Sequence, residues 1–563
     1  LKDLGKLDEA EISTRKAIQI KPDLPEAHYN LGNILKDLGK SQEAESSYLK
    51  AVEIKPNFPE AYNNLGIILY DLSKLKEAEI STRKAIELKP DFSNAHYNLG
   101  NILKDLGKLQ EAKKTYLRSL EIDPKEIHRI SNLIYILLKL CLWDEIEKYS
   151  PYFSKIGLEG KPIDPLTFMY LEDNPTNQLK RAIKFYNTKY KNKGTNIPYI
   201  KKEKIHIGYF SSDFKAHPVM YLISRVLELH DVSRYKIFIY SFDIKEDNYT
   251  QKLKEYPFHF RSIYGKSDLE AVAISRDDQL DIAMDLMGYT RSNRMNIFSY
   301  RVAPIQINFL GYPGTSGSSE IDYLIGDKVL IPDDYRKYYS EKVLYMPNCY
   351  MPFDNKRKIS TKKFSKSDFD LPEDSFVLAA FHKNYKITRN EIYSWSRILK
   401  RLPSSILWIS DAKDLAKSNL LRFFSKQGIE SKRILFCKRL DSIEEHLARH
   451  SCADLFIDTF NYNGHSTSID ALWSGLPVIT LLGNTFSARV SASLLTTLNL
   501  TELIANNVNQ YEDIIIDLAK DQKRLKQLKN KLLVSKTKNP LFDSDKYIKE
   551  FESILKGLVK NFN

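Results

Sequence analysis

The sequence has few cysteines and no long hydrophobic run, and each absence excludes a class of protein. Its four cysteines show no paired spacing, which argues against a disulfide framework or a cysteine-bound metal: Cys141, Cys349, Cys437 and Cys452. A reducing compartment fits this usage, so we expect a cytoplasmic protein. No stretch approaches the roughly 18 consecutive apolar residues of a membrane span, and no secretory signal is visible. Because LKDLGK (1–6) recurs later, we expect the sequence to begin within a repeat, with any upstream targeting signal outside it.

The chain also lacks a nucleic-acid-binding module, although it is basic. Its 563 residues suggest three to four domains, and 85 Lys and Arg against 72 Asp and Glu give a net charge of +13. Without a basic stripe, this excess predicts a lysine-rich solvated surface biased toward anionic ligands, and no nucleic acid partner. No acidic metal-binding motif is present, because Asp411 and Asp414 are too widely spaced. We therefore expect neither a metal nor a cofactor.

A motif recurs every 34 residues in the first part of the chain. LGNILKDLGK occurs at 31–40 and 99–108, with the variant LGIILYDLSK at 65–74. Small residues and prolines share the period: Gly32, Gly66 and Gly100; Ala10, Ala44, Ala78 and Ala112; Pro22, Pro56, Pro90 and Pro124. Each unit predicts two short helices, packed closely at the small residues and ended by the proline. The pattern resembles tetratricopeptide repeats and predicts an α-solenoid with a concave groove over residues 1–125.

Four asparagines repeat with the same period and are not explained by packing. They are Asn30, Asn64, Asn98 and Asn132. Asparagine is a mediocre helix former, whereas its amide both donates and accepts hydrogen bonds and suits an extended peptide backbone. We expect an amide ladder that holds a peptide in the groove; the alternative is four solvated positions.

Capping and linking helices are expected at 126–203, where the period fades, ending in a linker at 190–204 that is rich in Lys, Asn, Gly and Pro. Strand-like apolar stretches then alternate with helical ones, at 204–212, 235–242, 280–286, 304–317, 323–327, 376–383, 405–410, 433–439, 454–460 and 477–482. This alternation predicts parallel sheets covered on both faces. We expect two Rossmann-like lobes, at 204–355 and 376–563, the second including a terminal helix, with a linker at 356–375. Ligands of such sheets bind at the carboxyl ends of the strands.

One of these strand ends carries an unusually polar turn, in NYNGHSTSIDALWSGLP (461–477). We expect Ser466 or Thr467 to cap a helix that contains Asp470. The first N–H groups of that helix, with its positive end, would face an anion. A helix end alone holds a diphosphate weakly, and His465 and Lys386 are candidates to assist it. The alternative is an ordinary capped helix.

Four motifs together resemble one enzyme family. They are GYPGTSG (311–317), SSDFKAHP (211–218), FHKNYKIT (381–388) and NGHSTSID (463–470). With the repeats, they are similar to the O-linked N-acetylglucosamine transferases, inverting glycosyltransferases of the two-lobed GT-B fold. SPINDLY-type relatives, which transfer fucose, share the layout. The chain has no room for a large domain between the lobes, which matches bacterial members of the family.

The resemblance implies a role for each matching residue. His217 matches a cleft histidine, once proposed as the base, and His259 a second histidine near the acceptor. Lys386 matches the lysine that neutralises the leaving diphosphate. The nucleotide-binding positions would be His446, Arg449, His465, Ser466, Thr467 and Asp470, and the sugar pocket would include Leu310 and Gly311.

These motifs predict a metal-independent protein O-glycosyltransferase. It would move N-acetylglucosamine from UDP-GlcNAc to Ser or Thr hydroxyls of peptides in the repeat groove. One alternative is the same fold using GDP-fucose, because His382 and Lys383 replace two amide residues that contact the nucleotide, and Asp281 lies where SPINDLY-type proteins carry Asp. Another is a repeat scaffold with a non-catalytic nucleotide-binding half.

Overall fold

The chain folds into two units, in a computed structural model that describes residues 6–190, 194 and 197–560. The first unit comprises Leu1–Leu140 and Asp144–Lys161, and the second comprises Cys141–Trp143 and Pro162–Asn563. No helix in this described part is both long and apolar enough to cross a bilayer. The four cysteines are buried and carry free thiols.

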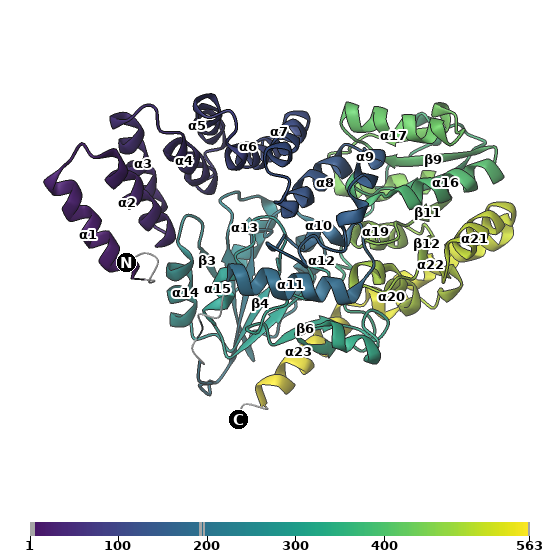
Figure 1. Cartoon of the computed structure of the whole chain (residues 1–563). Helices are drawn as coiled ribbons and strands as arrows, with labels where there is room; N and C mark the ends of the chain where they lie inside the picture. The colour runs from purple at the N-terminus through teal and green to yellow at the C-terminus, as the bar shows by residue number, and fades with distance from the viewer. Residues whose placement is uncertain (1–5, 191–193, 195–196, 561–563) are drawn as a thin grey trace. The chain divides into compact units, whose positions relative to one another are not determined.

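The first unit is a series of antiparallel helix pairs (Figure 1). Its helices are α1 (Leu7–Ile20), α2 (Pro25–Asp37), α3 (Ser41–Ile54), α4 (Pro59–Asp71), α5 (Leu75–Leu88), α6 (Ser93–Asp105), α7 (Leu109–Ile122) and α8 (Ile130–Lys139). As predicted, α1, α3, α5 and α7 each end two residues before a repeating proline. The repeating glycine is required by close packing, because a Cβ at Gly32 would lie 2.6 Å from the Tyr48 ring and one at Gly100 2.5 Å from Tyr116. These observations confirm the predicted solenoid.

The first lobe of the second unit is built on a seven-stranded parallel sheet, in the order β3-β2-β1-β4-β5-β6-β7. Its strands are β1 (Ile205–Ser211), β2 (Tyr235–Ser241), β3 (His259–Ser262), β4 (Ile282–Asp285), β5 (Ile305–Asn308), β6 (Tyr323–Gly326) and β7 (Lys342–Tyr345). The helices between them are α12 (Pro218–Glu228), α13 (Asn248–Glu255), α14 (Asp268–Asp277) and α15 (Met295–Ser299). The strand order reverses between β1 and β4.

The second lobe repeats this plan with a six-stranded parallel sheet, in the order β10-β9-β8-β11-β12-β13. Its strands are β8 (Phe376–Ala380), β9 (Ser405–Ser410), β10 (Ile434–Cys437), β11 (Leu455–Ile457), β12 (Val478–Leu481) and β13 (Ile504–Ala505). Its helices are α16 (Arg389–Arg401), α17 (Asp414–Lys426), α18 (Ile443–Ala448), α19 (Ser466–Trp473), α20 (Val490–Thr497), α21 (Val508–Lys520) and α22 (Gln522–Lys538). The strand order reverses between β8 and β11, so the predicted pair of Rossmann-like lobes is confirmed.

The structure divides residues 126–203 differently from the predicted capping and linking segment. Two short helices, α9 (Trp143–Glu147) and α10 (Leu166–Met169), precede α11 (Pro175–Lys189), which packs on the first lobe. There the Tyr186 hydroxyl donates to the Glu320 carboxylate, and the Phe185 ring lies 5.1 Å from that of Tyr289. In the predicted linker at 190–204, residues 191–193 and 195–196 lie outside the described residues. The boundary between the units therefore falls inside the predicted segment.

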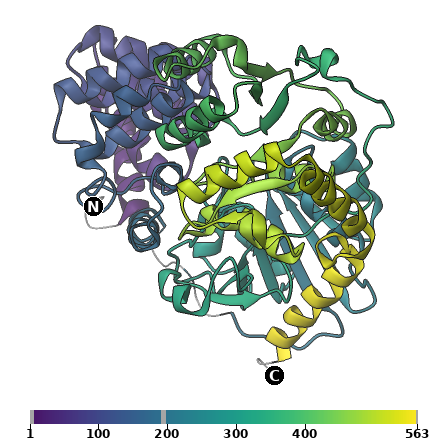
Figure 2. The same cartoon turned by 90° about the vertical axis from the view of Figure 1, so that its right-hand side faces the viewer.

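The terminal helix α23 (Ser544–Lys560) belongs to the first lobe by its contacts, although we assigned it to the second. Glu552 accepts 3.0 Å hydrogen bonds from the ring of His230 and from the backbone N–H of Asp231. The Phe551 ring lies 5.4 Å from Phe309, which follows β5. In Figure 2 the yellow α23 runs beside the strands of the first lobe. The chain therefore crosses back after building the second sheet.

Candidate active site

Two loops meet where the strand order of the second sheet reverses. Connections leaving β8 and β11 run to opposite sides, which opens a crevice at their carboxyl ends. The segment after β8 carries Lys386, and the segment after β11 carries residues 463–467, NGHST, of which the last two begin α19. The Nζ of Lys386 donates a 2.9 Å hydrogen bond to the carbonyl of Asn463 and lies 4.1 Å from the ring centroid of Tyr462. The structure thus brings the predicted lysine onto the predicted turn.

The turn itself has a conformation that glycine and few other residues accept. At His465 φ is +45°, in the left-handed region. A Cβ at Gly464 would lie 2.2 Å from the hydroxyl oxygen of Ser468, so this position leaves no room for a side chain. The His465 ring stacks on Tyr462 at 4.7 Å and its Nε2 donates to the carbonyl of Ser487, 3.2 Å away. The imidazole is therefore fixed beside the turn.

Our expectation that Ser466 or Thr467 caps α19 was wrong. The helix begins at Ser466, and its N-cap residue is His465, which makes no side-chain cap hydrogen bond. The Thr467 hydroxyl turns back and donates 2.8 Å to the carbonyl of Gly464. An N-terminus without a side-chain cap is suited to an anion, because helix-end N–H groups take an acceptor from outside the helix.

Burial controls the charge of the groups around Lys386. It lowers the pKa of Lys386 to about 7; the negative charge of Asp458 opposes this shift and the positive charge of Lys383 adds to it. Burial also lowers the pKa of His382 to about 3 and holds that of His465 well below its usual range. Both rings are therefore neutral near pH 7. Of these three side chains, Lys386 is the one that can carry a positive charge and pair with an anion bound at the turn.

The predicted base-binding residues lie beside the same crevice. The guanidinium of Arg449 lies 4.8 Å from the ring centroid of Phe381, and its Nη1 donates 2.7 Å to the carbonyl of Lys438. The ring of His446 lies 5.1 Å from that of His450, and burial lowers the pKa of His446 to about 2. Neutral His446 therefore offers an aromatic face rather than a charge.

Asp470 has a partner that we did not predict. Its Oδ1 lies 2.6 Å from Nη1 of Arg357, and both side chains are 8% exposed. The Arg357 guanidinium also lies 5.7 Å from the ring of Tyr221 on α12, so it bridges the helix after β1 and the helix after β11. Sequence reasoning missed this pair, because Arg357 lies in a lysine-rich joint whose composition indicates only a solvated basic surface. Asp470 can meet a ribose hydroxyl only with the oxygen atoms that this ion pair leaves available.

The first lobe contributes His217, the N-cap residue of α12 after β1. Its Nδ1 lies 3.3 Å from a carboxylate oxygen of Asp213 and 3.4 Å from the backbone N of Val219. Burial lowers the pKa of His217, although the charge of Asp213 opposes the shift, so the ring is neutral near pH 7. Nδ1 accepts the backbone N–H of Val219 as the N-cap of α12, so in this geometry the neutral ring carries its proton on Nε2.

Leu310 and Gly311 lie just beyond the carboxyl end of β5. Leu310 has φ of +69°, and a Cβ at Gly311 would lie 1.8 Å from the carbonyl oxygen of Leu286. Leu286 directly follows β4, so the loops after two neighbouring strands touch at a position that only glycine allows. The two residues therefore stand at the same edge of the first sheet as His217.

Comparison with known proteins decides the family. The sequence profile described as Glycosyl transferase family 41 matches residues 179–364 and 356–551, which is more than half of the chain. The chain belongs to glycosyl transferase family 41. Tetratricopeptide repeat profiles match the first unit at 1–39, 32–73, 59–92 and 93–126.

Curated proteins and one solved structure are similar to the chain. It is 33% identical over 357 residues to the probable UDP-N-acetylglucosamine–peptide N-acetylglucosaminyltransferase SEC of Arabidopsis thaliana, covering 62% of this chain and 36% of that protein. To the SPINDLY protein of Solanum lycopersicum, which carries the same probable activity in its name, it is 30% identical over 366 residues, covering 63% and 39%. The chain thus spans about two fifths of these relatives. A mutant of the Thermobaculum terrenum O-GlcNAc transferase superposes with a TM-score of 0.70 at 24% identity, over 96% of this chain and 98% of that one, which shows the shared fold.

The structure does not bring His259 together with the other predicted residues of this family 41 site. His259 lies at the amino end of β3, an edge strand, whereas the site lies at carboxyl ends. Its ring stacks on Phe238 at 4.9 Å, and the His206 ring lies 5.4 Å from the same phenylalanine. This packing at the far end of the sheet gives His259 a structural role and no contact with the predicted sugar pocket.

The asparagine ladder of the repeats is engaged in contacts between neighbouring repeats. The Nδ2 atoms of Asn64, Asn98 and Asn132 donate 2.9 Å hydrogen bonds to the side-chain oxygens of Asn33, Asn63 and Asn101, respectively. Asn64 and Asn132 also donate to the hydroxyls of Tyr29 and Tyr97. Asn30, in the first described repeat, is exposed. The amides therefore stiffen the solenoid, and their role in peptide binding remains a prediction.

Replacing both Asn64 and Asn98 with alanine is expected to change two properties of the solenoid, its stability and its binding of protein substrates. Each lost inter-repeat hydrogen bond costs about 1 kcal/mol, so the melting temperature of residues 1–161, measured by circular dichroism on the whole chain, should fall. If the ladder also holds peptide, protein substrates should bind several-fold more weakly while hydrolysis of the donor stays unchanged.

The matched control is Asn57→Ala, because Asn57 is exposed in the loop before α4. It should leave both readings unchanged. Unaltered protein binding in the double variant would show that the ladder serves stacking alone.

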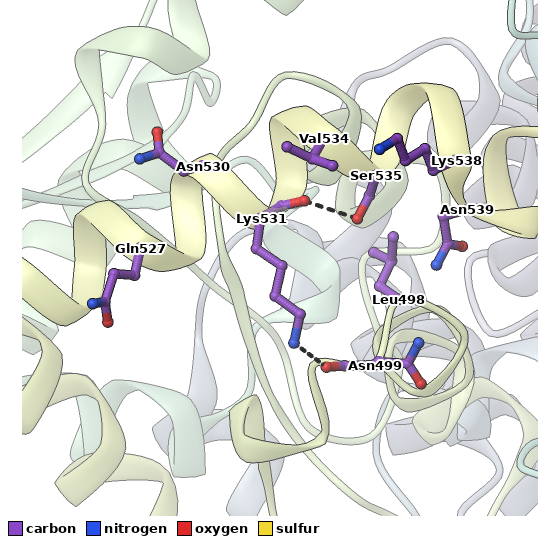
Figure 3. Close-up of a pocket in the computed structure, with 9 residues that line it drawn as sticks. All are labelled: Leu498, Asn499, Gln527, Asn530, Lys531, Val534, Ser535, Lys538 and Asn539. Carbon is purple, nitrogen blue, oxygen red and sulfur yellow. Dashed lines mark hydrogen bonds between the residues drawn. The ribbon is translucent and has the colours of Figure 1, made fainter.

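Two cavities lined by described residues lie away from the predicted site. One is a groove of about 440 Å³ between α22 and the turn after α20, lined by Leu498, Asn499, Gln527, Asn530, Lys531, Val534, Ser535, Lys538 and Asn539. Figure 3 shows Lys531 reaching the carbonyl of Asn499 across it. The other, of about 320 Å³, includes Lys202 and Leu280 at the amino ends of the first sheet. Among the described residues, no cluster of three or more His, Cys, Asp or Glu has the arrangement of a metal site.

Proposed function

We propose that the chain is an inverting protein O-glycosyltransferase that transfers N-acetylglucosamine from UDP-GlcNAc to Ser or Thr hydroxyls. One observation carries the proposal. The ammonium of Lys386 lies on the NGHST turn, at the uncapped N-terminus of α19 and at the strand-order reversal of the second sheet. This arrangement fits a nucleoside diphosphate leaving group.

The leaving group acquires charge as the reaction proceeds. When the bond between sugar C1 and the diphosphate oxygen breaks, the electron pair stays on the diphosphate. The Lys386 ammonium and the positive end of α19 would stabilise that charge, and so the transition state more than the ground state. The lowered pKa of Lys386 supports this role, because a nearby diphosphate raises that pKa and keeps the lysine charged.

The acceptor hydroxyl attacks C1 from the opposite face and its proton must leave. His217 is the candidate to receive it on Nε2, once the ring proton has moved to Nδ1, which then gives up the Val219 N–H and donates to Asp213, 3.3 Å away. As the ring becomes charged, the Asp213 carboxylate stabilises it. The new bond joins the acceptor oxygen to C1 with inversion, and His217 later returns the proton to solvent.

The identity of the donor is the finer part of the proposal. The names of the Arabidopsis and Solanum relatives support UDP-GlcNAc. GDP-fucose is the alternative, because His382 and Lys383 occupy positions where the family has amides. His382 is buried and donates to the carbonyl of Ile457, 3.0 Å away, so it presents no amide to a nucleotide. Asp281 bears on neither donor, since it lies before β4 and pairs with Lys202 at 2.5 Å.

The proposed acceptors are protein segments held in the repeat groove. Tetratricopeptide repeats expose a long concave surface, and an extended peptide there would offer Ser and Thr hydroxyls in sequence. Metal is not required by this chemistry, because Lys386 and the helix end supply the positive charge. A repeat scaffold whose second unit binds nucleotide without catalysis is the remaining alternative.

The deciding experiment offers UDP-GlcNAc and GDP-fucose separately, with a mixed protein lysate as acceptor, and detects products by mass spectrometry. The proposal expects addition of one N-acetylhexosamine from UDP-GlcNAc and no deoxyhexose from GDP-fucose. The reverse result would assign the chain to fucose transfer. A thermal shift with UDP or GDP but no product from either sugar would favour the scaffold.

A further inference from the structure

A carboxylate lies beneath the turn that carries the predicted diphosphate site. Asp458 directly follows β11 and is 0% exposed. Its Oδ1 accepts hydrogen bonds from the backbone N–H groups of Thr459, at 2.9 Å, and Gly464, at 2.7 Å. Its Oδ2 accepts a 3.0 Å hydrogen bond from the hydroxyl of Thr480 on β12. One side chain therefore ties the start of the turn to its end and to the neighbouring strand.

Holding Gly464 in place fixes what lies on either side of it. The carbonyl of Asn463 accepts the ammonium of Lys386, and His465 begins the cap of α19 with its left-handed φ. The Asn463 side chain is held as well, because its Nδ2 donates to the carbonyl of Thr459, 2.8 Å away. The position of the lysine thus depends on a turn that is closed from below by Asp458.

The same carboxylate also acts on the charge of Lys386. The charged and titratable groups that face this lysine are Lys383 on its own loop, His382 after β8, His465 at α19 and Asp458 after β11. Lys383 repels the ammonium and the two histidines are neutral. Asp458 is the carboxylate that favours the charged form of Lys386.

We propose that Asp458 is a positioning residue, which holds the diphosphate turn in shape and whose negative charge favours the ammonium form of Lys386. Because its side chain is fully buried, it does this without touching the donor. The inference rests on the proposed function for the role of Asp458 in catalysis. The effect of Asp458 on the charge of Lys386 can be tested whether or not the chain transfers sugar. It predicts a pH dependence that a purely structural aspartate would not produce.

The test replaces Asp458 with asparagine and, as a second neutral variant, with serine. Loss of a nearby opposite charge lowers a lysine pKa by about one unit or more. The alkaline limb of nucleoside diphosphate binding should therefore move about one pH unit lower. Calorimetry with UDP or GDP, whichever binds the wild type, should show about tenfold weaker binding at pH 8 and near-normal binding at pH 6.

Thr480→Val is the comparison variant, because it removes a hydrogen bond to Asp458 and keeps the carboxylate. Burial raises the pKa of Asp458 to about 6 and the Thr480 hydroxyl opposes that shift, so the pH limb of this variant should lie between those of the wild type and the neutral variants. A second measurement needs no ligand: acetic anhydride labelling of lysines across pH, read by peptide mass spectrometry, should place the midpoint of Lys386 lower in the neutral variants than in Thr480→Val. Equal midpoints in all variants would overturn the proposal.

The outcomes separate this inference from the proposed function. Normal pH-dependent diphosphate binding without sugar transfer would refute the glycosyltransferase and retain the role of Asp458. Sugar transfer by the wild type, with an unshifted alkaline limb of diphosphate binding in both neutral variants, would support the glycosyltransferase and refute the role of Asp458. If UDP and GDP both fail to bind the wild type, the labelling midpoints still decide whether Asp458 controls the charge of Lys386.

Discussion

Replacing Lys386 with alanine is expected to lower kcat for sugar transfer about 10³-fold. Removing one preorganised donor to a developing negative charge costs 10²–10³ in rate, and Lys386 supplies a full charge in a partly enclosed site. A 10³-fold loss corresponds to about 4 kcal/mol of transition-state stabilisation. Folding should not suffer, because burial already disfavours the charged lysine, as its lowered pKa shows. Single-turnover kinetics at saturating donor would isolate the chemical step.

The matched control for this change is Lys383→Ala. Lys383 lies three residues earlier on the same loop and is exposed, so its loss should change kcat less than tenfold. It should also ease the repulsion on Lys386 and move the alkaline limb of activity to higher pH, since Lys383 helps to lower that pKa. Turnover of Lys386→Ala within tenfold of the wild type would remove the lysine from the mechanism.

The regular part of the fold could be predicted because its signals are local and repeated. A 34-residue period identified the solenoid, and buried strands such as FVLAA (376–380) appear as continuous apolar runs. The strands that we missed are β3, β7 and β13. Each lies at the edge of its sheet, and HFRS (259–262) and KVLY (342–345) include polar or charged residues that an edge strand tolerates. These three strands lack the continuous apolar run on which the prediction depended, whereas the edge strand β10, in RILFCKR (433–439), has one and was predicted.

The parts of the site that lie close in sequence were also predictable, whereas contacts across the fold were not. NGHST is one turn, and its link to Lys386 follows from the order of parallel strands. The Arg357–Asp470 pair joins residues 113 positions apart, and composition predicts only a solvated basic joint around Arg357. Glu552 and His230 are 322 positions apart, so no local pattern placed α23 on the first lobe. His259 was predicted to lie in the site and does not, because the motif that it matches does not indicate at which end of a strand the residue lies.

A second large effect is expected where the loops after β4 and β5 touch. Gly311→Ala places a methyl group 1.8 Å from the carbonyl oxygen of Leu286, and neither partner is a flexible side-chain end. The backbone must shift, which should cost at least about 3 kcal/mol of folding free energy. The melting temperature should fall by about 5 °C or more, and the displaced loop should raise the donor KM, because Leu310 and Gly311 border the predicted sugar pocket.

Gly557→Ala provides the comparison for this substitution, since nothing lies within 4 Å of a Cβ at Gly557 on the exposed face of α23. Alanine in a helix interior is favoured over glycine by about 1 kcal/mol, so this variant should be as stable as the wild type or slightly more so. Calorimetry of the two variants would thus separate steric overlap from the general effect of removing a glycine. Equal stability of Gly311→Ala and the wild type would mean that the two loops are not in the contact described, and that the strand ends around His217 are further apart than the proposed mechanism requires.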